Sequence, residues 1–230
     1  MPVISIVMPV LDEADGIVAA LAALQPLRAA GAEVLVVDGG STDATVALAT
    51  PLADRVIAAP RGRASQMNAG AAVARGEVLL FLHADTILPE GAVHLIAAAV
   101  SASRVWGRFD VAINGRSPWL PLVATLMSRR SRLTGIATGD QAMFVTRSAF
   151  TTVGGFPDLP LMEDIELSKR LLQHSRPACI AARVTTSGRR WERHGIWRTI
   201  LTMWRFRLRY FLGADPAQLA REYGYVPREF

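Results

Sequence analysis

Short apolar segments alternate with helix-forming segments over the first part of the chain, and this alternation restricts the chain to few folds. The apolar segments are Ile4–Val10, Val34–Val37, Arg55–Ala58 and Val78–His83. Each is followed by turn residues and then by a stretch with the length and composition of a helix. Strands that alternate with helices form a parallel sheet covered on both faces. We therefore predict an α/β fold with a mostly parallel central sheet flanked by helices.

Acidic residues follow three of these predicted strands. Asp12 comes after the first strand, Asp38 ends the second, and Asp85 comes after the fourth. The carboxyl ends of parallel strands lie at one edge of a sheet, where open α/β sheets bind ligands. The alternative is that each acid caps the next helix, as Asp85 would cap a helix beginning near Pro89. We favour a nucleotide and metal site. It requires one shared edge of the sheet, whereas the alternative requires three separate helix-capping residues at that same edge.

The second half of the chain departs from this regular pattern. The predicted elements there are a helix over Pro89–Val100, strands over Trp106–Val111, Ala142–Thr146 and Ala178–Thr186, and a helix over Ile165–Gln173. Between them, Asn114–Gly135 contains two prolines and the basic residues Arg129, Arg130 and Arg132. We expect this segment to pass over the mouth of an active site; the alternative is a solvated basic helix face.

Two adjacent acids, Glu163 and Asp164, open the predicted helix Ile165–Gln173. Acidic side chains are favoured at a helix start by the helix dipole, so capping is one interpretation. The other is a general base placed at a helix mouth. The residues alone leave both open.

Composition sets wider limits. The 230 residues are 51% hydrophobic and 20% charged, which is typical of one globular α/β domain. The net charge is +5 and the pI about 10.3, and nearly all cations are arginines, which suit phosphate and carboxylate binding. A single cysteine fits a reducing compartment. No apolar run has the length of a membrane span, and the amino terminus has no signal-peptide pattern, so we expect a cytoplasmic protein.

Five segments resemble, in order and spacing, the motifs of family 2 glycosyltransferases. They are SIVMPVLDE, VLVVDGGSTD, GRASQMNAGAAVARGEVLLFLHADT, GDQAMFV and GGFPDLPLMEDIELSKRL. The resemblance runs from about residue 4 to about residue 193. The chain resembles in particular a short bacterial subgroup, the arsenosugar-biosynthesis-like glycosyltransferases. Members of this subgroup have HAD, as this chain does at 83–85, in place of the usual acidic triplet. The resemblance implies a GT-A (Rossmann-like) domain over 1–194, with a nucleotide-binding half over about 1–100 and an acceptor half over about 101–194.

The resemblance also implies roles for the matching positions. Asp85 matches the last acid of the metal-binding triplet and would hold Mn²⁺ or Mg²⁺, while Asp164 matches the catalytic base and Glu163 precedes it. The implied substrate-binding residues are Pro9, Asp12, Glu13, Asp38, Arg63, Gln66, Asn68, His83, Asp140, Arg189, Arg190 and Trp191. His83 replaces the first acid of the triplet, and we expect it to hydrogen bond near the substrate rather than to ligate the metal.

The function implied by the resemblance is transfer of a sugar from a nucleotide diphosphate sugar to an acceptor hydroxyl, with inversion. A UDP-sugar is the first expectation for the donor; the acceptor is an unidentified small molecule or lipid. One alternative is a nucleotidyltransferase, but such enzymes favour a basic glycine-rich loop where this chain has the acidic LDEADG. Another is a non-catalytic module that binds nucleotides or nucleic acid. The sheet is expected to be buried, so we expect no nucleic-acid partner.

The segment 195–230 is expected to be a helical extension packed on the domain. Its residues Gly195–Leu212 have helical spacing with two apolar sides, which indicates a helix between two partners. One stripe is Trp197, Leu201, Trp204, Leu208 and Phe211; the far side is Met203, Phe206 and Tyr210; the arginines between them are Arg198, Arg205, Arg207 and Arg209. The second partner is a sister subunit, an acyl chain or the inner face of an anionic membrane. The alternative is a helix packed wholly in its own domain.

Overall fold

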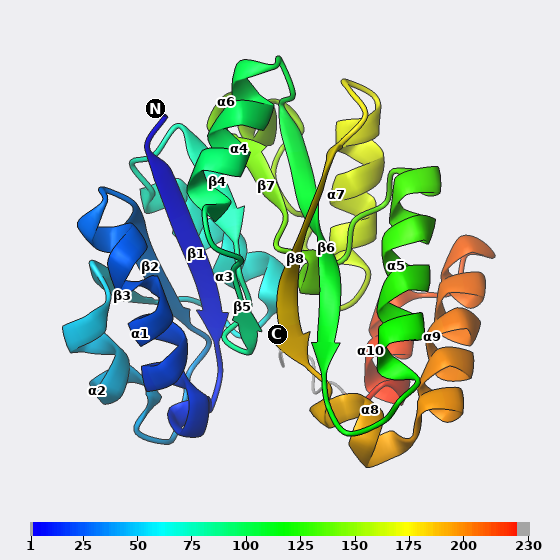
Figure 1. Ribbon diagram of the computed structural model, residues 1–230. Helices are drawn as coiled ribbons and strands as arrows, with labels where there is room; N and C mark the ends of the chain where they lie inside the picture. The colour runs from blue at the N-terminus through cyan, green and yellow to red at the C-terminus, as the bar shows by residue number, and fades with distance from the viewer. Residues whose placement is uncertain (1, 225–230) are drawn as a thin grey trace.

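A computed structural model describes residues 2–224 and contains, within them, an eight-stranded sheet with helices on both faces (Figure 1). The strands are β1 (Ile4–Val10), β2 (Glu33–Asp38), β3 (Arg55–Ala58), β4 (Val78–Phe81), β5 (Thr86–Ile87), β6 (Trp106–Asn114), β7 (Phe144–Thr146) and β8 (Ala178–Ser187). The helices are α1 (Ala14–Ala29), α2 (Thr45–Ala49), α3 (Arg63–Val73), α4 (Ala92–Ser101), α5 (Leu120–Thr134), α6 (Arg147–Thr152), α7 (Glu163–Leu172), α8 (Arg189–His194), α9 (Ile196–Phe211) and α10 (Pro216–Glu222), with 3₁₀ turns η1 (Thr50–Leu52) and η2 (Gly139–Gln141).

The amino-terminal half of the sheet has the parallel arrangement that the alternation predicts. The strands β3, β2, β1 and β4 lie side by side in that order, and each pair is parallel. Val10 at the end of β1 is in register with Asp38 at the end of β2, which is in register with Ala58 at the end of β3. The carboxyl ends of these strands therefore meet at one edge, as predicted.

The rest of the sheet continues from β4 in the order β7, β6, β8 and β5. β7 is antiparallel to both of its neighbours, while β6 and β8 are parallel to each other. β5 was not predicted, because two residues carry no pattern. It pairs Thr86 with Thr186 and Ile87 with Thr185 of β8, and so ties the segment that follows Asp85 to the far half of the sheet.

Two apolar cores lie on opposite faces of the sheet. The alternation of β1 divides its side chains between them: Ile6 and Met8 pack with Leu21 of α1, while Val7 packs with Ala71 of α3. Each fully buried aliphatic side chain of this kind contributes roughly 1.5–3 kcal/mol to stability. The cores hold β1, β2 and β4 in place, and with them the loops at their carboxyl ends.

Most of the segment Asn114–Gly135 is a regular helix, α5. α5 packs against β6 through Leu120, Val123 and Ala124, all of which are buried. Pro121 is tolerated because it lies in the first turn, where a backbone N–H has no helical partner. The expected break in regular structure was therefore wrong for most of this segment, which forms a helix.

The carboxyl-terminal helices pack on the start of α7. Phe206 of α9 and Leu219 of α10 are buried against Met162 and Ile165. The opposite stripe of α9 is exposed, so the alternative of a helix packed wholly in its own domain is wrong. Within the described part of the chain, no helix has the length and apolar character needed to cross a bilayer. Of the expected extension, 225–230 lie outside the described residues.

Candidate active site

The loops after β1 and β2 are hydrogen bonded to each other. The Asp12 carboxylate accepts a hydrogen bond from the Thr42 N–H (2.8 Å), and the Asp12 N–H donates to Ser41 Oγ (2.9 Å). The Glu13 N–H donates to Thr45 Oγ1 (2.8 Å). Asp12 has a φ of 51°, a left-handed conformation that aspartate tolerates better than most residues and that suits a tight turn.

Asp38 is buried, and its carboxylate shapes the turn that follows it. It accepts hydrogen bonds from the Gly40 N–H (3.0 Å), the Ser41 N–H (3.1 Å) and the Ser41 hydroxyl. Pro9 lies one residue before the end of β1, in register with Val37 of β2. Pro9 and Asp38 thus lie at the predicted edge of the sheet. There the carboxylate oxygens of Asp38 stabilise the turn at Gly40 and Ser41.

Gln66 and Asn68 of α3 use their side-chain amides on the main chain. Gln66 Nε2 donates to the carbonyls of Val10 and Val37, both at 2.8 Å, and so joins the ends of β1 and β2. A Cβ at Gly39 would lie 3.0 Å from the Gln66 carboxamide, which explains why glycine suits that position. Asn68 exchanges two hydrogen bonds with the backbone of Phe156 (2.8 and 3.0 Å). These amides hold the loops of the site in place.

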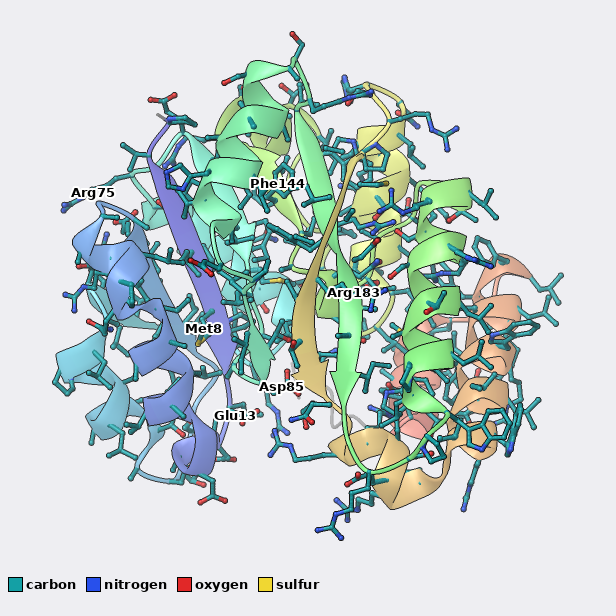
Figure 2. All side chains as sticks on the ribbon, viewed as in Figure 1. Met8, Glu13, Arg75, Asp85, Phe144 and Arg183 are labelled. Atoms are coloured by element: carbon teal, nitrogen blue, oxygen red, sulfur yellow. The ribbon has the colours of Figure 1, made fainter. Side chains whose placement is uncertain are left out.

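Asp85 lies at the same edge with an open carboxylate. Figure 2 shows it near Glu13, at the arrowhead of β1. Burial raises the pKa of Glu13, and the charge of Asp85 raises it further against the opposing charge of Arg189. Among the described residues, the Asp85 carboxylate accepts one hydrogen bond, from Thr86 Oγ1 (3.3 Å). The helix α4 begins only after Gly91, so the alternative of Asp85 as a helix cap is wrong.

His83 follows β4 and lies against η2. A Cβ at Gly139 would be 2.5 Å from His83 Cε1, so glycine is what allows the imidazole this position. Burial, with a contribution from the charge of Arg63, lowers the pKa of His83 to about 4. His83 Nδ1 lies 4.0 Å from Asp140 Oδ1. Because the imidazole is neutral near pH 7, this approach is not an ion pair there.

The acids Glu163 and Asp164 lie in the first turn of α7. Asp164 accepts hydrogen bonds from the Gly139 N–H (3.0 Å) and the Ile165 N–H (2.7 Å), yet burial and the charge of Asp140 still raise its pKa. Burial and the charge of Asp164 raise the pKa of Glu163 to about 7. Neither acid is the capping residue, since the N-cap is Met162, which has a φ of 71°.

A small cavity brings the two halves of the site together. Its volume is about 10 Å³, room for roughly one water, and its walls include His83, Gly139, Glu163 and Asp164. The end of β4 and the start of α7, 80 residues apart, therefore face each other. The cavity joins His83 to the acids of α7, and Asp12, Asp38 and Asp85 are not among the residues that line it.

Arginines surround this group of acids. Burial opposes the charged form of Arg63, but the carboxylates of Glu163, Asp140 and Asp164 outweigh it and raise its pKa. Arg189 lies 3.9 Å from Glu13. The Arg190 guanidinium stacks 3.9 Å from the centre of the Tyr223 ring. Trp191, which follows Arg190 in α8, is half-buried.

One site residue, Arg130 of α5, was not among the predicted site residues. Burial lowers the pKa of Arg130, and the charges of Asp164 and Asp140 oppose this shift. The Arg130 guanidinium is therefore close enough to both carboxylates to interact with them electrostatically. Its Nε and Nη2 atoms are buried and have no hydrogen-bond partner among residues 2–224. The only signal in the sequence was the cluster Arg129, Arg130 and Arg132, and nothing in that cluster marks which arginine faces the site.

The residues at this edge of the sheet fit a divalent cation that would be held partly by the protein and partly by a bound diphosphate. In the described part of the chain, no three His, Cys, Asp or Glu side chains are grouped as a metal cage. Mg²⁺ in nucleotide sites is commonly held by one or two carboxylates together with substrate phosphates and water. The carboxylate of Asp85, which accepts one hydrogen bond among the described residues, matches the protein part of that donor set.

Comparison with known sequences places most of the chain in one family. Residues 5–151 match the model described as Glycosyl transferase family 2. The chain is also similar to the uncharacterized glycosyltransferases Rv0539 of Mycobacterium tuberculosis and Mb0553 of Mycobacterium bovis. Each is 32% identical over 133 residues, which cover 56% of this chain and 59% of the relative. The chain thus spans less than two thirds of the length of these relatives.

Solved structures share the fold. The fragment 1–349 of S. aureus TarS in complex with UDP-GlcNAc has a TM-score of 0.65 at 18% identity, covering 80% of this chain and 58% of that one. The mannosyltransferase PcManGT of Pyrobaculum calidifontis, in complex with GDP-Man and Mn²⁺, has a TM-score of 0.65 at 22% identity. The match covers 90% of this chain and 60% of that one. Glucosyl-3-phosphoglycerate synthase of Mycobacterium tuberculosis, with Mn²⁺ and UDP, gives 0.60 at 21%, covering 79% and 70%. These similarities confirm the predicted GT-A α/β fold.

Proposed function

Since the chain belongs to glycosyl transferase family 2, we propose that it transfers a sugar from a nucleotide diphosphate sugar to an acceptor hydroxyl with inversion at the anomeric carbon. A UDP-sugar is the expected donor and a GDP-sugar the second choice. Structures of the same fold contain UDP-GlcNAc, UDP or GDP-Man, which supports a donor of this class. The acceptor is a small molecule or a lipid.

One observation carries the proposal: the carboxylate of Asp164 is fixed by two backbone N–H groups and faces the edge where β4 ends. Hydrogen bonds of this kind favour the ionised form, which a general base requires. As the acceptor oxygen attacks the anomeric carbon, Asp164 takes its proton. The bond between that carbon and the phosphate oxygen breaks, and the nucleoside diphosphate leaves with the electron pair. A single displacement inverts the configuration.

The other residues of the site bind and orient the donor. The turns held by Asp12, Asp38 and Gln66 form the floor on which the nucleotide would lie. Arg63 and Arg189 add positive charge toward the diphosphate, where preorganised charge is most effective. A bound Mn²⁺ or Mg²⁺, held by Asp85, would supply further charge against the leaving diphosphate.

A thermal-shift panel of nucleotide-sugars with Mn²⁺ or Mg²⁺ tests the donor site. A ligand that binds only the folded protein raises the melting temperature, by an amount set by its concentration relative to Kd. We expect one nucleotide-sugar to raise it with the metal present, and Asp85→Ala to remove the metal-dependent part of the shift. The control is Asp158→Ala, because Asp158 is exposed in a loop. A panel without any shift, or an Asp85→Ala variant that responds like wild type, would contradict the assignment.

A further inference from the structure

We propose that the exposed apolar face formed by α9 and the start of α5 binds the surface of an anionic lipid bilayer. We call this surface the α5–α9 face. The inference is independent of the proposed function, because it concerns binding to a membrane and requires no sugar transfer.

The α9 part of this face is apolar and open to solvent. Its residues follow helical spacing and are 60–72% exposed: Trp197, Leu201, Trp204, Leu208 and Phe211. The opposite side of the helix is occupied, since Thr199 and Phe206 are buried at 3% and 1% exposure. The helix therefore lies flat on the protein with a continuous apolar stripe outward. An exposed apolar surface of this extent is unusual for a monomeric protein and marks an interaction site.

The start of α5 extends the same surface. Trp119, Leu122 and Leu126 are 49–55% exposed. The ring centres of Trp119 and Trp197 lie 6.1 Å apart, which joins the two exposed surfaces at the amino-terminal ends of their helices. Figure 1 shows α5 and α9 at the same end of the molecule. Tryptophan is enriched where an apolar medium meets water, as at the headgroup region of a bilayer.

The charge of the face selects the occupant. The segments of α5 and α9 contain seven arginines and no Asp or Glu. Three of the seven are engaged elsewhere, since Arg130 lies near Asp164, Arg132 pairs with Asp110 and Arg209 pairs with Glu222. Arg129, Arg198 and Arg205 are exposed and make no ion pair with another described residue. Arginine beside exposed tryptophan and leucine is the composition of helices that lie in the interface of anionic membranes.

A second copy of the chain fits this face less well. A two-fold dimer places the same patch against itself. The exposed arginines of both copies would then be brought together with no acid on either helix to compensate them. An anionic lipid surface supplies the missing negative charge at every point of the face.

Flotation of the full chain with vesicles tests the inference. We expect wild type to float with vesicles of phosphatidylcholine and phosphatidylglycerol (about 7:3) at low salt, at least tenfold more than with phosphatidylcholine alone. We expect Leu201→Glu and Trp204→Glu each to reduce flotation at least tenfold. The matched control is Val18→Glu, which places the same charge on an exposed helical position of α1 and should float like wild type. Because all three positions are exposed, the melting temperatures should stay close to that of wild type.

Three outcomes would overturn the inference. The first is no flotation of wild type with either vesicle at low salt. The second is flotation that Leu201→Glu and Trp204→Glu leave unchanged, which would place the contact elsewhere. The third is a wild-type dimer, measured by sedimentation equilibrium, that Leu201→Glu dissociates while neither protein binds vesicles.

Discussion

Burial acts in opposite directions on two side chains that line the same small cavity. The pKa of His83 falls to about 4 and that of Glu163 rises to about 7. Between about pH 4 and pH 7 both side chains are therefore mostly uncharged. Asp164 beside them accepts two backbone hydrogen bonds that favour its ionised form. Burial thus raises the pKa of both adjacent carboxyl groups, and at Asp164 the two backbone hydrogen bonds oppose this rise.

The raised pKa of Glu163 predicts a pH-dependent stability difference. A carboxyl whose folded pKa lies above its unfolded value stabilises the protein at low pH, and this contribution is lost as the pH rises through the folded pKa. Relative to wild type, Glu163→Gln should therefore gain stability between about pH 4.5 and pH 8, by roughly 2–3 kcal/mol.

Urea unfolding at pH 4.5, 6 and 8 measures this difference. The matched control is Glu90→Gln, since Glu90 is exposed in the loop before α4; its difference from wild type should hardly change with pH. A Glu163→Gln difference that is equally independent of pH would show that the carboxyl is not perturbed.

The sequence predicted the position of the acids at one edge of the sheet but not the hydrogen-bond partners of the amides. Asp12, Asp38 and Asp85 each follow a predicted strand, and parallel pairing alone brings such positions to one edge. Gln66 and Asn68 lie on a predicted helix. The helical spacing of residues shows which side chains share a face of the helix, but it does not identify their hydrogen-bond partners. Their partners are carbonyl and N–H groups of distant loops, which only the folded chain specifies.

At the scale of elements, α3 fastens the ends of β1 and β2. The two 2.8 Å hydrogen bonds from Gln66 Nε2 reach both strands. A Cβ at Gly70 would lie 2.4 Å from Val7 Cγ1, so this helix packs closely on the sheet. The loops that carry Asp12 and Asp38 are thereby held against a rigid support.

Removing the Gln66 amide should destabilise the protein. Gln66→Leu keeps the volume but leaves the buried carbonyls of Val10 and Val37 without this donor, at a cost of about 1–3 kcal/mol in the free energy of unfolding. Chemical denaturation measures the change. The control Gln173→Leu alters an exposed glutamine at the end of α7 and should change stability by less than about 0.5 kcal/mol. Equal effects of both variants would contradict the role of Gln66.

The elements that sequence reasoning missed were short or had misleading composition. β5 has two residues and exists because it pairs with β8, a partner about 100 residues away. The prolines around the start of α5 suggested an irregular segment, whereas Pro121 is compatible with the first turn of a helix. The strands β1 to β4 were found to within a few residues, because their apolar runs are bounded by clear turn residues.

At the scale of the whole molecule, the carboxyl-terminal helices support the acid pair. Phe206 and Leu219 pack on Met162 and Ile165, which flank Glu163 and Asp164. Tyr210 Oη donates to Glu166 Oε2 at 3.0 Å, and this hydrogen bond holds α9 to α7. The period of α9 predicted its two apolar sides. Which apolar side of α9 faces the protein depends on its packing against α7. The local sequence of α9 does not specify this packing.

Turnover of the donor identified by thermal shift, with the divalent metal present, tests the central claim that Asp164 is the base of a glycosyltransferase. Wild type and Asp164→Asn would be compared for release of the nucleoside diphosphate, and for donor affinity by calorimetry. We expect Asp164→Asn to lower the rate of release by at least about 100-fold, the lower range for a general base, and to change donor affinity by less than about threefold. An Asp164→Asn variant that releases the nucleoside diphosphate at nearly the wild-type rate would contradict it.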